Sequence, residues 1–135
     1  VVRGATLEAG VEVGPFSHIR PGTHLENDVH IGSFAEVKNS RLGAGTMSGH
    51  FSYVGDAQIG AQVNIGAGTV TCNYDGKEKH PTVIADGALI GSSTMLIAPV
   101  TVGKLAKTGA GSVVREDVAP GDTVAGVPAK SIKSK

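Results

Sequence analysis

Aliphatic side chains recur at every sixth position along most of this chain. A period of six matches neither an α-helix, which repeats about every 3.6 residues, nor a simple alternating strand. It is typical of a short strand followed by a turn, three times per coil. The chain is therefore predicted to be all-β, wound into a triangular prism of parallel β-structure. The repeat positions are Val1, Leu7, Val13, Ile19, Leu25, Ile31, Val37, Leu42, Ser48, Val54, Ile59, Ile65, Thr71, Ile84, Ile90, Leu96, Val102, Thr108 and Val114.

The residues around each repeat position predict a narrow core. Two residues earlier stands a small or β-branched residue, such as Ala35, Val63 or Ala106, and glycine often follows the repeat residue. Aromatic residues make up only 4% of the chain and tryptophan is absent, whereas a conventional globular core uses more large rings. At a strand spacing of about 4.8 Å, about seven coils form a prism about 35 Å long.

Assigning successive hexads to three faces predicts which residues stack in columns along the prism. The first face begins at Val1, Ile19, Val37, Val54, Thr71, Leu96 and Val114. The second begins at Leu7, Leu25, Leu42, Ile59, Ile84 and Val102. The third begins at Val13, Ile31, Ser48, Ile65, Ile90 and Thr108.

Two cations are expected to stack on the first face. Arg20 and Lys38 follow the repeat residue in successive coils, so they lie about 5 Å apart. Like charges at that distance repel unless an anion lies between them or carboxylates neutralise them. A phosphate group is one candidate anion, and solvated surface charge is the alternative.

A histidine lies at the end of a column of small side chains on the third face. Two residues after each repeat position the column contains Pro15, Ser33, His50, Ala67, Ser92 and Ala110. In the coils that follow His50 in the chain, the side chains of this column are small, which predicts a groove for a slim extended ligand. A lone histidine is more often structural than catalytic, but its place at the end of this channel favours a chemical role.

The repeat is interrupted once and fades near its end. Residues 73–81 form a charged insertion with a turn signal at Asp75-Gly76, and Lys79 in it could reach a neighbouring subunit. Past Val114 the pattern is expected to fade. We expect a β-helix domain over 1–118 and a closing loop with a basic tail over 119–135, and the tail contains Lys130, Lys133 and Lys135.

Charge and cysteine content exclude several classes of partner. The 12 basic and 12 acidic residues balance, so neither nucleic acid nor an anionic membrane is indicated as a partner. No apolar run approaches membrane-spanning length. A single cysteine, Cys72, fits a reducing cytoplasm and is read as a small buried hydrophobe rather than a nucleophile. Because the chain begins at Val1 in register, it is read as a fragment.

Three runs of the sequence resemble the hexapeptide-repeat acyltransferases, and among them the bacterial glucosamine-1-phosphate N-acetyltransferases. The runs are IRPGTHLENDVHIGSFAEVKNS, GHFSYVGDAQIGAQVNIGAGTVTCNYDG and IGSSTMLIAPVTVGK. The resemblance implies a left-handed parallel β-helix, a homotrimer with sites between subunits, a cytoplasmic bacterial enzyme and no metal. Members of this group also contain a uridyltransferase domain that is missing here, so this chain alone is expected to make no UDP-sugar.

The resemblance also implies a role for each matching position. His50 is the general base, and acetyl-CoA is the acetyl donor for the amine of glucosamine-1-phosphate, giving N-acetylglucosamine-1-phosphate for cell-envelope synthesis. Sugar-phosphate contacts fall on Arg20, Lys38, Tyr53, Asn64 and Lys79. Coenzyme contacts fall on Ala67, Asn73, Tyr74, Ser92 and Ala110. The chain departs from the group at Gly126, where an arginine is expected, and Lys130 is a weak substitute.

An imidazole, whose pKa lies near neutrality, suits removal of a proton from an attacking amine. Glu36, one coil below, is a candidate to orient His50. Three alternatives stay open: another amino-sugar acceptor, a γ-type carbonic anhydrase, and a non-catalytic β-helix scaffold such as an ice binder. His18, His24 and His30 recur every six residues, which places them on successive faces where they cannot converge on one zinc ion. The scattered threonines form no flat ice-binding array.

Overall fold

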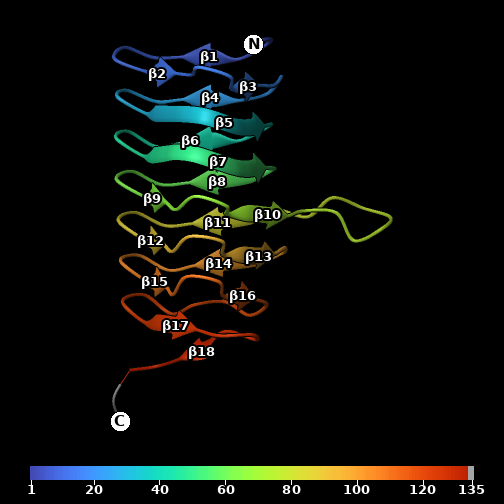
Figure 1. Cartoon of the computed structure of the whole chain (residues 1–135), viewed down its shortest axis with the longest axis vertical. Helices are drawn as coiled ribbons and strands as arrows, with labels where there is room; N and C mark the ends of the chain where they lie inside the picture. Colours follow the sequence, from blue (N-terminus) through green and yellow to red (C-terminus); the bar gives the residue numbers. More distant parts are fainter. Residues whose placement is uncertain (134–135) are drawn as a thin grey trace.

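The structure is a computed structural model that describes residues 1–133, and it is a prism of stacked β-coils (Figure 1). The expected basic tail reaches Lys135, which lies outside the described residues. Within residues 1–133 the chain forms no helix that could span a lipid bilayer.

Short strands occupy three faces of the prism. The second-face strands are β1 (Thr6–Leu7), β4 (His24–Leu25), β6 (Arg41–Leu42), β8 (Ala57–Ile59), β11 (Thr82–Ile84) and β14 (Val100–Val102). The first-face strands are β3 (His18–Ile19), β10 (Val70–Cys72), β13 (Met95–Ile97) and β16 (Val113–Val114). The third-face strands are β2 (Glu12–Val13), β9 (Asn64–Ile65), β12 (Leu89–Ile90), β15 (Lys107–Thr108) and β17 (Thr123–Ala125). β5 (His30–Lys38) and β7 (Met47–Gly55) run along both the third and the first face.

The predicted columns are confirmed by parallel strand pairing. Ile31 pairs with Ser48 and Val37 with Val54 between β5 and β7. On the second face Leu25, Leu42, Ile59, Ile84 and Val102 pair in succession. The register therefore follows from the hexad count, five-residue steps included.

The register needs correction at both ends. Ile19 pairs with Val2 rather than with the expected Val1, because the first coil is one residue shorter than a full set of hexads. The repeat also continues past Val114. Val118 bridges to Val102 and Val124 pairs with Thr108, so another coil forms before β18 (Lys130–Ser131) turns back antiparallel to β17. The proposed domain division at residue 118 stays a prediction.

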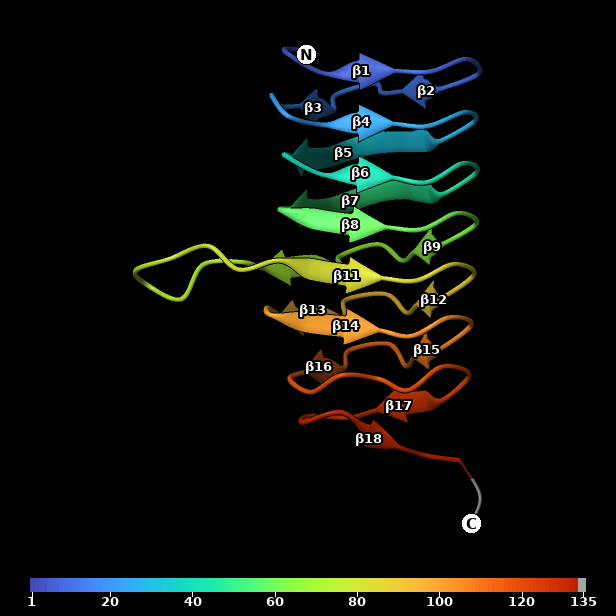
Figure 2. The same cartoon turned by 180° about the vertical axis from the view of Figure 1, so that it is seen from behind.

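Handedness is visible when the two views are compared. In Figure 1 the corner formed by β5 and β7 is nearest the viewer and runs left to right. In Figure 2, seen from behind, the second-face strands are in front and again run left to right as the chain descends. The coil is therefore left-handed, as the resemblance implies and against the usual preference for right-handed crossovers.

The core is a thin column of aliphatic side chains inside the prism. Ile19, Leu25, Leu42 and Leu96 are fully buried, and small residues such as Ala57 fill the corners. The insertion at residues 73–81 leaves this column and projects sideways as an arm (Figure 1). The rigid prism fixes the spacing of the outward side chains that form the site.

Candidate functional site

The two first-face cations are both neutralised within the chain. Arg20 Nη1 lies 2.8 Å from Glu36 Oε2, and Lys38 Nζ lies 3.0 and 3.1 Å from the two carboxylate oxygens of Asp56. The repulsion that favoured a bound phosphate is therefore relieved by carboxylates, which was the other possibility. A phosphate site at these cations must be argued on different grounds.

Asp56 is the centre of the first-face polar network. Besides Lys38, it accepts hydrogen bonds from the side-chain amides of Asn39 at 2.9 Å and Asn73 at 2.8 Å. Burial opposes ionisation of this carboxyl, but the bonds from Asn39, Lys38 and Asn73 outweigh it and lower the pKa of Asp56. Sequence reasoning missed Asp56 as a member of the site, and its place at the corner after Gly55 was the available signal.

Tyr53 joins this network through a close packing arrangement. The Asn73 amide lies 3.3 Å from Tyr53 Oη, and both side chains cross the face of Gly55. A Cβ added at Gly55 would lie 2.3 Å from Tyr53 Oη and 2.6 Å from Asn73 Nδ2, so only glycine fits here. Lys38, Asp56, Asn73 and Tyr53 thus form one group, although Asn73 was expected to contact the coenzyme.

His50 lies at the corner between the third and first faces. It is exposed, and within residues 1–133 its side chain forms no hydrogen bond. The proposed orienting role of Glu36 is wrong, because Glu36 binds Arg20 and pairs in register with Tyr53, whereas His50 pairs with Ser33. The strand geometry places Glu36 on the first face, past the corner that His50 occupies.

The small-residue column continues from His50 up the same corner, at Ala67, Ser92 and Ala110. Hydrogen bonds from Gly68 N to Phe51 O, Ser93 N to Ala67 O and Gly111 N to Ser92 O connect the successive corners. Among the described residues, the backbone N–H groups of Ala67 and Ser92 donate no hydrogen bond. These amides are available to a ligand in the corner.

The remaining predicted residues lie elsewhere. Asn64 faces outward on the third face between Met47 and Leu89, on the other side of the corner from Arg20. Tyr74 and Lys79 are in the arm, where they form an antiparallel bridge and the Lys79 ammonium lies 4.6 Å from the Tyr74 ring centroid. One protomer therefore does not bring all predicted residues together.

A separate cleft of about 610 Å³ lies where the arm rejoins the prism. His24, Arg41, Lys79 and His80 are among its lining residues, and His50 is not. Most of these side chains already have partners: His24 contacts Glu8, Arg41 contacts Glu26 and His80 contacts Asp75. The cleft adds no group to the His50 corner.

The histidine spacing does not assemble a zinc site. His18, His24 and His30 begin strands or strand segments on different faces, and His30 contacts Glu12. Within residues 1–133 Asp75, Glu78 and His80 do converge, but Asp75 already accepts bonds from the Lys77 and Glu78 amides and from His80. These bonds order the arm.

Fold, repeat and site together define a class of protein. Residues 4–39 match the family model described as bacterial transferase hexapeptide (six repeats). The coils within this range therefore contain the bacterial transferase hexapeptide repeat.

Bifunctional GlmU proteins are among the curated relatives that match most of this chain. The chain is 56% identical over 119 residues to the bifunctional protein GlmU of Acinetobacter baumannii (strain AYE), which covers 88% of this chain and 26% of the relative. It is 59% identical over 117 residues to the bifunctional protein GlmU of Thermosipho africanus (strain TCF52B), covering 87% of this chain and 26% of the relative. The chain thus spans about a quarter of the length of these relatives.

A solved acetyltransferase has the same fold. The acetyltransferase domain of PglB from Neisseria gonorrhoeae FA1090 superimposes with a TM-score of 0.83 at 27% identity, covering 90% of this chain and 57% of that one. The same domain in complex with acetyl coenzyme A superimposes with a TM-score of 0.68, covering 96% and 58%.

Proposed function

We propose that this chain transfers the acetyl group of acetyl-CoA to the amine of glucosamine-1-phosphate, with His50 as general base. The observation that carries the proposal is the exposed imidazole of His50, without a partner among residues 1–133, at the end of the small-residue corner. The complex of PglB with acetyl coenzyme A and the identity to GlmU proteins support the donor and acceptor.

The coenzyme arm would lie along Ala67, Ser92 and Ala110 with its thioester at His50. The amine nitrogen attacks the thioester carbonyl carbon, and the C–N bond forms as His50 accepts the amine proton. The free amides of Ala67 and Ser92 are suited to stabilise the oxyanion that develops. The C–S bond then breaks, and the leaving sulfur takes the proton back from His50 to give coenzyme A and the N-acetyl sugar.

Arg20 is the cation best able to bind the sugar phosphate. In its ion pair with Glu36 the Arg20 side chain is 38% exposed and the Glu36 side chain 41%. Such an exposed pair is weak, so a phosphate dianion can displace the carboxylate. The Lys38 side chain is 23% exposed and that of its partner Asp56 only 13%, so Lys38 stays fixed in that pair. Tyr53, bonded to Asn73, would hold the sugar beside His50.

The site would be completed by other copies of the chain. Asn64 and Arg20 lie on different faces of one prism, and Lys79 is in a projecting arm, so these residues cannot contact one sugar in a single protomer. A homotrimer with its sites between subunits would bring them together. Light scattering should give three times the chain mass, and a monomer that retains full activity would contradict this assembly.

The test is release of coenzyme A thiol with glucosamine-1-phosphate, glucosamine-6-phosphate and glucosamine as acceptors. Removing a general base lowers kcat by about 10²–10⁴-fold, which is expected for His50→Ala. His30→Ala is the matched control, since His30 lies on the third face and contacts only Glu12. Arg20→Ala should raise KM for the phosphorylated acceptor. Near wild-type acetylation by folded His50→Ala, or preference for an acceptor without the 1-phosphate, would overturn the proposal.

A further inference from the structure

Three phenylalanines form a ladder on the corner that contains His50. Phe16, Phe34 and Phe51 occupy the position after the small-residue column in successive coils. Their ring centroids are 5.6 Å apart for the first pair and 6.4 Å for the second. All three rings are exposed, Phe51 by 66%. Because aromatic residues make up only 4% of this chain, a row of three exposed rings at one corner suggests a function for them.

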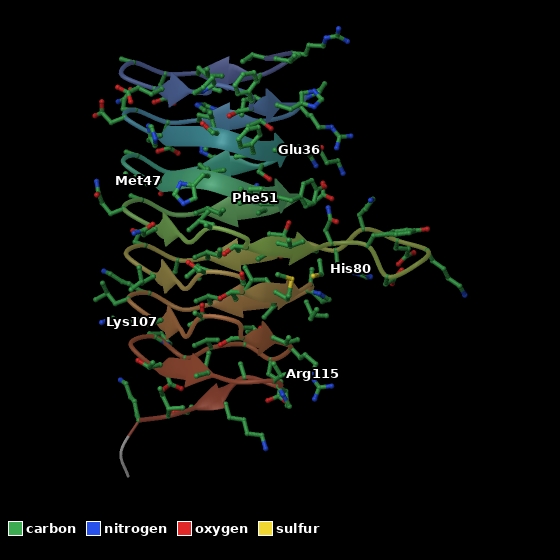
Figure 3. All side chains as sticks on the ribbon, viewed as in Figure 1. Glu36, Met47, Phe51, His80, Lys107 and Arg115 are labelled. Carbon is green, nitrogen blue, oxygen red and sulfur yellow. The ribbon has the colours of Figure 1, made fainter. Side chains whose placement is uncertain are left out.

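The ladder ends where the proposed coenzyme corner begins. In the next coils its position is occupied by Gly68, Ser93 and Gly111. Gly68 has a φ of +81°, compared with 52° for Phe51, and it has no side chain to continue the ladder. Phe51 is thus the last ring of the ladder, and it directly follows His50. Figure 3 shows it at the near corner, between the edges marked by Met47 and Glu36.

We propose that the ring of Phe51 is a steric stop that limits the length of the acyl group transferred. This inference rests on the proposed function, since it takes the coenzyme to approach His50 along Ala67 and Ser92. An acyl chain that extends past the thioester carbonyl, toward the coil that precedes Gly68 in the chain, meets the Phe51 ring. An acetyl group ends at its methyl carbon, whereas a butyryl group requires the space that the ring fills.

The ladder below explains why the ring stays in place. Phe34 supports Phe51 from the coil beneath, and Phe16 is stacked on Phe34 with an interplanar angle of 8°. Paired rings at these distances add to the packing energy beyond burial alone. A shift of Phe51 down the corner would bring its ring against Phe34. Phe51 is a specificity-determining residue, and Phe34 is a positioning residue one step further from the acyl group.

The experiment compares kcat/KM for acetyl-, propionyl- and butyryl-CoA in wild-type, Phe51→Ala and Phe34→Ala proteins. Both alanines replace a phenylalanine at a positive φ, 52° and 60°, so the backbone strain is matched. In Phe51→Ala the butyryl-to-acetyl ratio should rise at least about tenfold, because one methylene in an apolar pocket discriminates by about 10–200-fold. In Phe34→Ala the ratio should rise much less.

The outcomes separate this inference from the proposed function. A folded Phe51→Ala with the wild-type ratio overturns the steric stop alone, and so does an equal rise in both variants, which would mean general loosening of the corner. No acetyl transfer by wild-type protein overturns the proposed function and the stop with it. If Phe51→Ala does not fold, Phe51→Leu keeps an apolar side chain of smaller reach, and an unchanged ratio in that variant overturns the stop.

Discussion

Asp56 offers the sharpest test of how the first face is held together. Its carboxylate accepts two bonds from Lys38, one from Asn39 and one from Asn73, while its side chain is only 13% exposed. Asp56→Ala removes all of these acceptors at once. Asn73 is 5% exposed, and within residues 1–133 its side-chain amide would keep the contact with Tyr53 alone.

The loss in free energy of unfolding depends on which hydrogen-bond donors are left without an acceptor. Each neutral amide bond contributes about 1 kcal/mol, and the amide of Asn73 stays buried after its acceptor is removed. Lys38 is 23% exposed, so its ammonium can reach water and recover part of what it loses. Asp56→Ala should therefore lower the free energy of unfolding by about 3 kcal/mol.

The assay is urea unfolding of Asp56→Ala beside Asp86→Ala. Asp86 is an exposed corner aspartate whose carboxylate accepts one bond, from Ala61 N at 2.9 Å. Its replacement should cost about 1 kcal/mol or less. The reasoning is refuted if the two variants lose the same free energy of unfolding. Asp56→Ala should also raise KM for the sugar phosphate, because Lys38 loses the contact that fixes it.

The pH dependence has a definite sign. The pKa of Asp56 is lower in the folded chain than in the unfolded chain. Its contribution is thus fully present above the unfolded pKa of about 3.9 and is lost as the pH falls through the folded pKa. Between about pH 5 and pH 2 the wild-type protein should lose more stability than Asp56→Ala, and parallel curves would contradict this.

Four further changes have definite expected outcomes. Gly55→Ala should displace Tyr53 and Asn73 and lower affinity for the sugar phosphate, because the new Cβ would lie 2.3 Å from Tyr53 Oη; titration of binding checks it. Leu96→Ala empties a fully buried site and should cost about 2–5 kcal/mol in chemical unfolding, whereas Leu105→Ala, 59% exposed, should cost little. Cys72→Ser should retain most acetyl transfer, since burial raises the pKa of its thiol and direct transfer needs no acyl-enzyme; loss of thiol release would implicate the cysteine. Amides of Lys77 and Glu78 should exchange faster in Asp75→Ala; in the wild type their protection should persist to low pH, because bonds from Glu78, His80 and Lys77 lower the pKa of Asp75 to about 2.

Sequence reasoning was most successful for the columns. Ile31, Ser48 and Ile65 fall in one column by the hexad count alone, because inward side chains of a coil can stack only on the coil above. The reasoning was less successful at the ends. Val2 and Val124 were missed because irregular steps there break the count of six, while the strand pairing continues.

For the site, the sequence predicted positions but not partners. It placed His50 one coil before Ala67 and Arg20 one coil before Lys38. However, it assigned Glu36 to His50 and overlooked Asp56. The Phe16, Phe34 and Phe51 column was present in the same register, and the signal was three aromatics at one corner position. Whether two neighbouring charges meet depends on side-chain rotamers, which a repeat does not encode.

The six-residue period thus specifies the prism, its three faces and the order of side chains along each corner. The physical reason is that a narrow aliphatic core permits one register. Side-chain packing in the folded chain, which the repeat does not specify, pairs Arg20 with Glu36 and Lys38 with Asp56, and it leaves His50 without a partner within residues 1–133. Those contacts join residues 16 and 18 positions apart, about the length of one coil, and side-chain rotamers decide which of the facing residues meet.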